Sequence, residues 1–237
     1  MNKYTKNTDV VILCGGKGTR LGALTEKIPK ILIPIKGKPF LEVLLERLSA
    51  EGYKRFVLCV GHLGKEIANY VKNKRHKGRH DIDILISSEE EAMGTGGAVK
   101  NAESLIQSDP FIVMNGDMIF DMKLCALEDF HISLKSSLSI VITHDPERKD
   151  SGNVLVDQNN KIISFAERNS KEGGFMSAGI YVMNKSLLKN MDHVPFSLEY
   201  DFFPVVIKRV ACFGFMKPGL FIDIGTPDRY RKANEIN

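Results

Sequence analysis

A short apolar run that stops at a glycine pair is the feature that most constrains the fold of this chain. Asp9–Cys14 (DVVILC) is apolar after its first residue and is followed by Gly15-Gly16. A strand with one solvent-facing side alternates apolar and polar residues, whereas a continuous apolar run is typical of a strand covered on both faces. The run therefore predicts a buried strand of a parallel sheet that has helices on both sides.

The remainder of the first 145 residues alternates between strand-like and helix-like segments. Pro39–Ala50 has apolar residues at helical spacing, with Pro39 in its first turn and Gly52 at its end. This alternation with short loops predicts an α/β fold with a doubly wound, mostly parallel sheet. Further strands are expected over Arg55–Val60, Ile82–Ser87, Phe111–Met114 and Leu138–Thr143, and further helices over Gly64–Lys74, Gly96–Gln107 and Lys123–Leu134.

The residues after Pro146 follow a different pattern. Asn153–Val156 and Lys161–Phe165 predict a β-hairpin. No Pro/Gly/Ser-rich linker separates the two parts, so we expect one domain over residues 1–237, with the second part as an insertion that covers the first sheet. Its other expected elements are strands over Ser177–Met183, Phe213–Met216 and Phe221–Ile224 and helices over Leu198–Arg209 and Thr226–Glu235.

The composition excludes several classes of protein. No apolar run approaches the ~18 residues of a transmembrane helix, and the polar segment Met1–Asp9 lacks the apolar core of a secretory signal. Thirty-three Lys and Arg against 29 Asp and Glu give a net charge of +4, too small to imply nucleic acid without a clustered patch. The basic run Lys72–His80 lacks interleaved aromatic side chains, and we expect it to be solvated. Reduced thiols of a cytoplasmic protein are expected for the four well-separated cysteines Cys14, Cys59, Cys125 and Cys212.

A glycine-rich segment, Leu13–Leu21 (LCGGKGTRL), directly follows the first strand. Gly15, Gly16 and Gly18 allow backbone N–H groups to point into a concavity that suits an anion. Arg20 adds a guanidinium that can hold two phosphate oxygens. The spacing matches neither the Walker loop nor the Rossmann fingerprint. The alternative is a glycine turn with a surface arginine.

A lysine shortly afterwards has a position set by stiff neighbours. Lys30 lies in Ile28–Ile35 (IPKILIPI), between a proline and an apolar run. A lysine held there can reach back to the same phosphates. The alternative is a solvated loop lysine.

Several motifs occur in one order along the chain. G-G-x-G-T-R-L is followed by P-K and then by P-I-x-G-K-P-F. Later segments that fit the same series are Gly94–Ala98, Asn115–Asp117, Glu167-Arg168, Ser177–Tyr181 and Phe221–Thr226. Together, over about residues 9–235, they resemble the sugar-1-phosphate nucleotidyltransferases, also called nucleotide-sugar pyrophosphorylases.

The resemblance implies a Rossmann-like sheet in which about residues 1–145 bind a nucleotide and about residues 146–237 bind a sugar and close the site. In the family reaction, a sugar 1-phosphate oxygen attacks the α-phosphorus of a nucleoside triphosphate (NTP) and expels pyrophosphate. The attacking phosphate is already an anion, so catalysis needs positioning and charge neutralisation rather than a general base. We therefore expect Arg20, Lys30 and Asp117 to be catalytic, with Mg²⁺ as cofactor.

The metal ligands implied by the resemblance are Asp117 and Asp223. Each follows an apolar strand and lies close to a glycine, and Mg²⁺ typically takes one or two protein carboxylates. The alternative for either residue is a turn-forming role. The residues implied to bind the nucleotide are Leu13, Gly15, Gly16, Gly18, Thr19, Glu89, Gly94 and Thr95.

Single residues determine which base and which sugar we expect the site to bind. In relatives, the residue five before Gly94 contacts the base, which points to Glu89. A carboxylate matches the adjacent N–H donors of guanine and repels the carbonyls of uracil, which favours GTP, while cytosine stays open. The alternative is that Glu89 belongs to a solvated acidic loop. The implied sugar-binding residues are Gly152, Glu167, Arg168 and Ser177, of which Arg168 replaces the usual lysine and Ser177 the commoner asparagine.

Within the family, the sequence is similar to the short bacterial guanylyltransferases that act on heptose 1-phosphate, which implies a cytoplasmic enzyme of surface-glycan synthesis. The expected partners are an NTP and a sugar 1-phosphate, without nucleic acid or membrane, and a homo-oligomer stays open. One alternative is a uridylyl- or cytidylyltransferase acting on another sugar 1-phosphate or phosphorylated small molecule. Another is a binding module without turnover, against which the presence of Arg20, Lys30, Asp117 and Asp223 argues.

Overall fold

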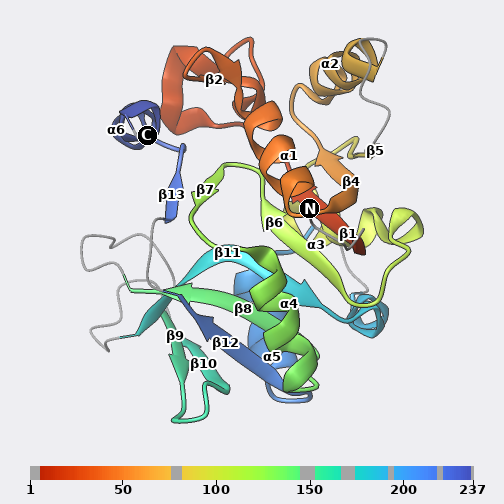
Figure 1. The fold of residues 1–237 in the computed structure, drawn as a ribbon, viewed down its shortest axis with the longest axis vertical. Coiled ribbons are helices and arrows are strands. Elements are labelled where there is room, and N and C mark those ends of the chain that lie inside the picture. The colour runs from red at the N-terminus through yellow and green to blue at the C-terminus, as the bar shows by residue number, and fades with distance from the viewer. Residues whose placement is uncertain are drawn as a thin grey trace.

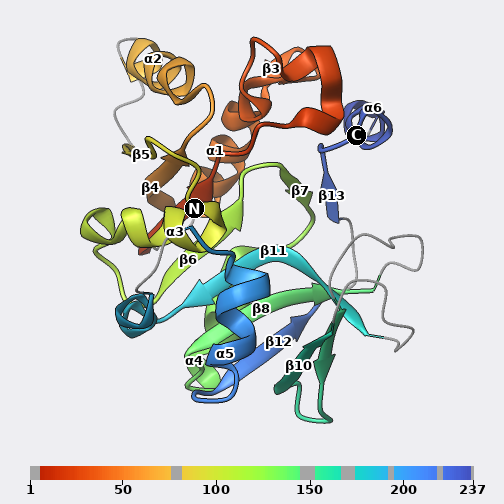
Figure 2. The ribbon, with the colours of Figure 1, turned by 180° about the vertical axis from the view of Figure 1, so that it is seen from behind.

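The computed structural model describes residues 6–75, 82–144, 153–166, 174–191, 195–217 and 221–235. It confirms the predicted α/β fold, in which helices cover both faces of a mostly parallel sheet (Figures 1 and 2). The parallel strands of its N-terminal half are β1 (Lys6–Leu13), β4 (Tyr53–Val60), β5 (Asp83–Ser88) and β6 (Phe111–Asn115). They lie side by side in the order β6-β1-β4-β5.

Both faces of β1 are buried, as its unbroken apolar run predicts. Val10 and Ile12 pack into the core on one face, Val11 packs into the core on the other, and all three are 0 % exposed. The first core includes side chains of α1 (Phe40–Ala50), α2 (Gly64–Arg75) and α4 (Leu124–Ser133), and the second those of α3 (Gly94–Asn101) and α5 (Phe203–Val206). Because β1 is fixed on both sides, the glycine-rich segment that follows it has a fixed starting point.

The C-terminal half completes this same sheet, which corrects the prediction that it would cover the first sheet. β11 (Phe175–Met183) lies antiparallel between β6 and β8 (Leu138–Thr143), and β12 (Cys212–Met216) pairs with the far side of β8. β11 is buried along most of its length, which suits a central strand. The predicted hairpin is present as β9 (Asn153–Val156) and β10 (Ile162–Ala166), and β9 pairs with the start of β11.

Short elements near the C-terminus contact the N-terminal half. β7 (Met118–Phe120) and β13 (Phe221–Asp223) form a small antiparallel sheet. α6 (Pro227–Glu235) lies beside the hairpin of β2 (Pro34–Ile35) and β3 (Lys38–Pro39) in both views (Figures 1 and 2). β2, β3 and β7 have no counterpart in the sequence prediction because two or three residues are too few to show a period.

The helix predicted over 198–209 is shorter and begins differently. Its first part is a π-helical turn, Leu198–Phe202, and only the four residues of α5 that follow are α-helical. Pro204 has no N–H to donate, so an unbroken helical ladder cannot run through it. Short 3-10 helices elsewhere span Thr19–Thr25, Lys30–Leu32, Glu103–Leu105 and Lys185–Asn190.

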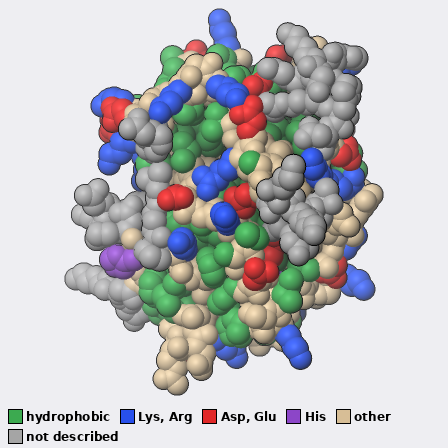
Figure 3. All heavy atoms as spheres, in the orientation of Figure 1, with side chains coloured by type: hydrophobic (Ala, Val, Ile, Leu, Met, Phe, Trp, Pro, Cys, Tyr) green, Lys and Arg blue, Asp and Glu red, His purple; other side chains and the backbone are tan. Residues whose placement is uncertain are grey.

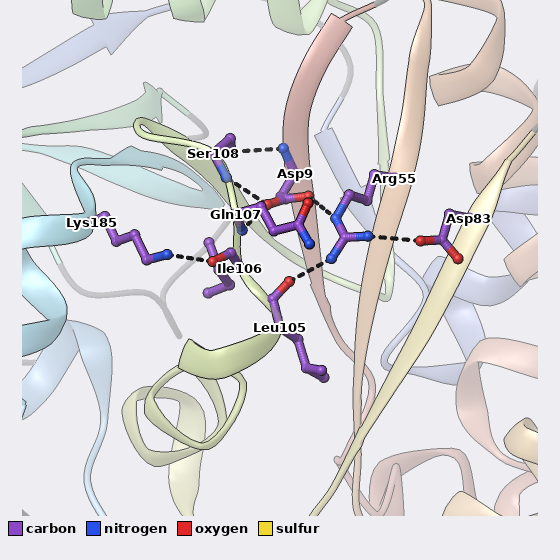
Figure 4. Close-up of polar contacts among 8 residues, drawn as sticks. All are labelled: Asp9, Arg55, Asp83, Leu105, Ile106, Gln107, Ser108 and Lys185. Atoms are coloured by element: carbon purple, nitrogen blue, oxygen red, sulfur yellow. Dashed lines mark hydrogen bonds and ion pairs between the residues drawn. The ribbon is translucent and has the colours of Figure 1, made fainter.

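A buried ion-pair network lies at the end of the sheet opposite the glycine-rich segment (Figure 4). Asp9 is 0 % exposed, and its Oδ2 accepts hydrogen bonds from the backbone amides of Gln107 and Ser108. Its Oδ1 forms an ion pair with Arg55 Nε at 2.7 Å, a contact without hydrogen-bond geometry. Arg55 also pairs with Asp83 at 2.7 Å. The buried carboxylate thus has both a counter-ion and hydrogen-bond donors, which compensate for its burial. Through these contacts the network connects β1, β4 and the segment before β6.

The same network explains why α3 is shorter than predicted. The helix expected over Gly96–Gln107 ends at Asn101. The Leu105 carbonyl accepts a hydrogen bond from Arg55, and the amide of the predicted last residue donates to Asp9. The Gln107 amide that bonds to Asp9 cannot also donate to the Glu103 carbonyl, and the amides of Leu105 and Ile106 donate three residues back instead of four, so the α-helical ladder does not continue to Gln107.

Charges of both signs lie on the described surface. On the face shown in Figure 3, acidic and basic side chains are interspersed among apolar ones, in keeping with the small net charge. Within the described ranges, no helix is long and apolar enough to cross a lipid bilayer.

A buried histidine in α4 makes the stability of the fold depend on pH. His131 is 2 % exposed, and its ring nitrogens contact Ser139 Oγ at 3.0 Å and Asn184 Oδ1 at 2.9 Å. Burial lowers the pKa of His131 and outweighs the opposing effects of Asn184 and nearby carboxylates. Because the unfolded chain then takes up this proton more readily than the folded protein, stability is lost as the pH falls below about 6.5.

We expect the free energy of unfolding to fall more steeply below about pH 6.5 in the wild type than in His131→Gln. The difference between the two slopes should be at most about 1.4 kcal/mol per pH unit, the value for one proton. Urea unfolding at a series of pH values measures both slopes, and the variant serves as the control for every other titrating group. Parallel curves for the two proteins would contradict the expectation.

Candidate active site

The carboxyl ends of the parallel strands open onto a cavity of about 560 Å³. Its walls come from the loops after β1, β5 and β6, from Cys59 near the end of β4, from the 3-10 helix that begins at Lys30, from the start of α3 and from Gly225 just after β13. This volume is typical of sites for small-molecule ligands. The predicted catalytic and nucleotide-binding residues all line it: Leu13, Gly15, Gly16, Gly18, Thr19, Arg20, Lys30, Glu89, Gly94, Thr95 and Asp117.

Two of the predicted catalytic residues are paired with each other. Lys30 Nζ donates to Asp117 Oδ2, and the side chains are 14 % and 27 % exposed. Lys30 begins a 3-10 helix and Asp117 follows β6, so the pair joins two separate loops of the cavity. Partial burial strengthens the attraction between the charges compared with a pair on the open surface. The lysine expected to reach phosphates thus has an aspartate as its partner in this structure.

Gly225 lies where three charged side chains converge. A Cβ atom placed on Gly225 would be 2.7 Å from Asp223 Oδ1, 3.0 Å from Lys30 Nζ and 3.1 Å from Arg20 Nη2. Any larger residue would displace at least one of these groups, so glycine allows the three side chains to approach in this arrangement. Arg20, Lys30 and Asp117 line this end of the cavity, and the buried Asp223 carboxylate lies next to Gly225 without lining the cavity itself.

The fold brings Asp117 and Asp223 close together although they are far apart in the sequence. The antiparallel pairing of β7 with β13 allows the Ile224 amide to donate to the Asp117 carbonyl at 2.9 Å. Asp223 is 5 % exposed and forms an ion pair with Arg229 at 2.8 Å. Among the described residues, no group of three or more His, Cys, Asp or Glu side chains is placed to hold a metal ion. A metal bound at these two aspartates would therefore need further ligands from water or the substrates.

Glu89 lines the cavity at the end of β5. Its Oε2 accepts a hydrogen bond from the Met93 amide at 3.1 Å, and its Oε1 lies 3.4 Å from where a Cβ of Gly15 would be. Burial raises the pKa of Glu89, and the Met93 hydrogen bond lowers it by less. A partly buried carboxylate is stabilised in its ionised form by N–H donors. Glu89 is therefore suited to accept hydrogen bonds from a ligand in the cavity.

Phe196, from the C-terminal half, holds the loop at the start of α3. Its carbonyl accepts from the Gly96 amide at 2.9 Å, and its own amide donates to the Met93 carbonyl at 3.0 Å. A Cβ on Gly96 would lie 2.0 Å from the Phe196 ring, so only glycine allows this contact. Close by, the Leu198 amide donates to Thr95 Oγ1 at 2.9 Å. One wall of the cavity is thus fixed by residues distant in the sequence.

The structure does not bring the predicted sugar-binding residues together at the cavity among the residues it describes. Gly152, Glu167 and Arg168 lie outside the described residues. Ser177 is in β11, where its Oγ accepts a hydrogen bond from the Gly179 amide at 3.2 Å, and it does not line the cavity. Sugar binding by these four residues stays a prediction.

Two residues that contact the site were not predicted as site residues. Gly94 and Gly96 indicate a close approach of another segment, but a sequence pattern does not say that Phe196 is the partner. Arg229 lies in α6, and its contact with Asp223 depends on where that helix docks. No local sequence signal identifies it.

With this fold and this site, the chain belongs to the nucleotidyl transferase family, whose model matches residues 9–237. The match confirms the resemblance that the ordered motifs indicate. Among curated relatives, the D-glycero-alpha-D-manno-heptose 1-phosphate guanylyltransferase of Aneurinibacillus thermoaerophilus is 32% identical over 96% of this chain and 97% of its own. The enzyme of that name from Campylobacter jejuni is 34% identical over 93% of this chain and 96% of its own.

A solved structure of similar sequence also matches. HddC from Yersinia pseudotuberculosis is 33% identical and superposes with a TM-score of 0.82, covering 96% of this chain and 98% of that one. A crystal structure of HddC complexed with GMP-PN superposes with a TM-score of 0.79.

Proposed function

We propose that this protein transfers the guanylyl group of GTP to heptose 1-phosphate in a Mg²⁺-dependent reaction. An oxygen of the sugar phosphate forms a bond to the α-phosphorus of GTP, and the bond from that phosphorus to the oxygen bridging to the β-phosphorus breaks. The products are a GDP-sugar and pyrophosphate. The observation that carries the proposal is the convergence of Arg20, Lys30 and Asp117 at one end of a glycine-lined cavity, with the Asp223 carboxylate next to Gly225 at the same end.

The donor set of the site fits Mg²⁺. This ion usually takes one or two protein carboxylates and completes its shell with water and substrate phosphates. Asp117 and Asp223 would supply the two carboxylates, and the contact of the Lys30 ammonium with Asp117 supports a positive charge at this position. The chemistry that the ion supplies when bound is neutralisation and polarisation of phosphate oxygens.

Other side chains of the site position and neutralise the substrates. The backbone amides of the loop 15–18 can bind the triphosphate, and Arg20 can hold two phosphate oxygens at once. Lys30 can turn from Asp117 toward a phosphate because its ammonium is carried on a flexible stem. The sugar phosphate is ionised near neutral pH, so no side chain has to remove a proton from it. This division of tasks agrees with catalysis by positioning and electrostatics.

Guanine is supported by Glu89 and by the comparisons. The Glu89 carboxylate lines the cavity and can accept hydrogen bonds from the adjacent N–H groups of guanine. Two relatives with full-length similarity are named guanylyltransferases, and HddC forms a complex with GMP-PN. The names of the same relatives support heptose 1-phosphate as the acceptor.

We expect Glu89→Gln to lower the ratio of kcat/KM for GTP to that for UTP by about tenfold or more. The reason is that a hydrogen bond to a charged group contributes about 1.5–3 kcal/mol, and the amide offers one acceptor and a repelling donor in place of the carboxylate. Steady-state kinetics with both nucleotides measures the ratio. Glu90→Gln is the matched control, because Glu90 is exposed and does not line the cavity. An unchanged ratio in Glu89→Gln would remove Glu89 from base selection.

The proposed activity is tested by pyrophosphate release from a matrix of substrates. Each of GTP, UTP, CTP and ATP is combined with Mg²⁺ and with hexose, heptose and amino-sugar 1-phosphates. We expect release to be fastest with GTP and heptose 1-phosphate, and to stop when EDTA removes the metal. Fastest release with UTP or CTP would replace the guanylyl assignment, and no release with any pair would indicate a binding module.

The cell compartment and pathway are part of the same proposal. All four cysteines are free and three of them are buried, in keeping with a reducing compartment such as the cytoplasm. An activated GDP-heptose is a donor for glycosyl transfer, which supports a role in surface-glycan synthesis.

A further inference from the structure

The two oxygens of the Asp223 carboxylate face different surroundings. Oδ2 contacts Arg229 Nη1 at 2.8 Å. Oδ1 accepts the Gly225 amide at 3.0 Å and lies on the side where Lys30 and Arg20 converge. We propose that Arg229 is a positioning residue, which holds Oδ2 so that Oδ1 is directed at the metal ion. This inference rests on the proposed role of Asp223 in Mg²⁺ binding.

The geometry of Arg229 is suited to this task because the helix that carries it is anchored. Tyr230 Oη donates to the Pro34 carbonyl at 2.7 Å, and Asn234 Oδ1 accepts from the Lys36 amide at 2.8 Å. These contacts dock α6 on the β2–β3 hairpin, which follows the segment that carries Lys30. Arg229 therefore holds Asp223 from an element with a fixed position relative to the cation cluster.

The chemistry of the two cations separates their roles. A guanidinium stays charged and presents donors in a rigid plane, so the Arg229 contact to Oδ2 sets the direction in which Oδ1 points. The side chain of Asp223 is 7 % exposed and that of Arg229 is 24 % exposed. At this burial, loss of Arg229 would leave the carboxylate with less charge compensation and without the contact that fixes the direction of Oδ2. Residues that orient metal ligands typically change metal affinity by about 10–100-fold when mutated.

The test is the affinity for Mn²⁺, measured by electron paramagnetic resonance on the full chain bound to a GTP analogue with an α,β-methylene bridge. We expect Arg229→Gln to weaken Mn²⁺ binding by about tenfold or more, and Arg229→Lys to restore part of the loss. In Asp223→Asn, which weakens binding by itself, adding Arg229→Gln should have no further effect. Arg231→Gln is the control, because Arg231 forms an ion pair with Asp228 in the same helix and both side chains are exposed (71 % and 84 %).

The outcomes distinguish the inference from the proposed function. Unchanged Mn²⁺ affinity in Asp223→Asn would contradict the proposed metal role of Asp223. A weakened Asp223→Asn together with an unchanged or tighter Arg229→Gln would overturn the positioning role alone. An equal effect of Arg229→Gln in both backgrounds would also overturn it, because Arg229 would then act without Asp223. If Arg229→Gln fails to fold, an affinity of Arg229→Lys equal to that of the wild type overturns the inference, and an intermediate one supports it.

Discussion

Asp117→Asn is expected to lower kcat by about 10²–10³-fold or more, with a much smaller change in the affinity for GTP. The substitution preserves the size of the side chain but removes its charge. Lys30 then loses its partner and the proposed metal site loses one of its two carboxylates. The glycine loop and Glu89, which contact other parts of the nucleotide in our proposal, are unchanged. Single-turnover kinetics and equilibrium binding of GTP separate the two effects.

Asp121→Asn is the matched control for this experiment. Asp121 lies four residues after Asp117, directly after the last residue of β7. It is exposed and does not line the cavity. Its substitution should leave kcat near the wild-type value. If kcat stays near normal in Asp117→Asn, the aspartate is not in the metal site and the proposed mechanism is wrong.

Asp9→Asn is expected to lower the free energy of unfolding by about 3 kcal/mol, because it leaves the guanidinium of Arg55 without its buried counter-ion. The asparagine oxygen can still accept the amides of Gln107 and Ser108, so the loss lies at the low end for a broken buried pair. Urea unfolding measures the change. The active site is at the other end of β1, so kcat at a temperature where the variant is folded should stay close to the wild-type value.

Asp83→Asn provides the comparison for the stability measurement. It removes the other acidic partner of Arg55, but the Asp83 side chain is 49 % exposed. An exposed pair contributes less than about 1 kcal/mol, so this variant should be close to the wild type. Equal losses in the two variants would mean that burial of Asp9 does not determine the strength of the network.

Much of the fold and the site can be predicted from the sequence because both follow local patterns. The strands β1, β4 and β6 each contain an unbroken apolar run, and a glycine follows each of them within two residues. The ligand end of a parallel sheet is the carboxyl end of its strands. The loops after β1, β5 and β6 therefore lie at the same edge of the sheet, which is why Gly15, Glu89 and Asp117 line one cavity.

The remaining features depend on contacts between distant segments. The pattern of β11 shows a buried strand but not which strands flank it, so its place in the first sheet could not be predicted. In the same way, the contacts of Phe196 with Gly96 and of Arg229 with Asp223 depend on how the C-terminal segments dock. Apolar period and motif spacing describe neighbours along the chain and carry no information about such docking.

The place of β11 also constrains the order of events during synthesis on the ribosome. β6 and β8 emerge earlier, yet they never pair with each other, because β11 lies between them in the finished sheet. Until residues 175–183 have been made, each of these two strands has an open edge, which is prone to wrong pairing. A nascent chain that contains the whole nucleotide-binding half therefore cannot join β6 and β8 into one sheet until β11 has been made.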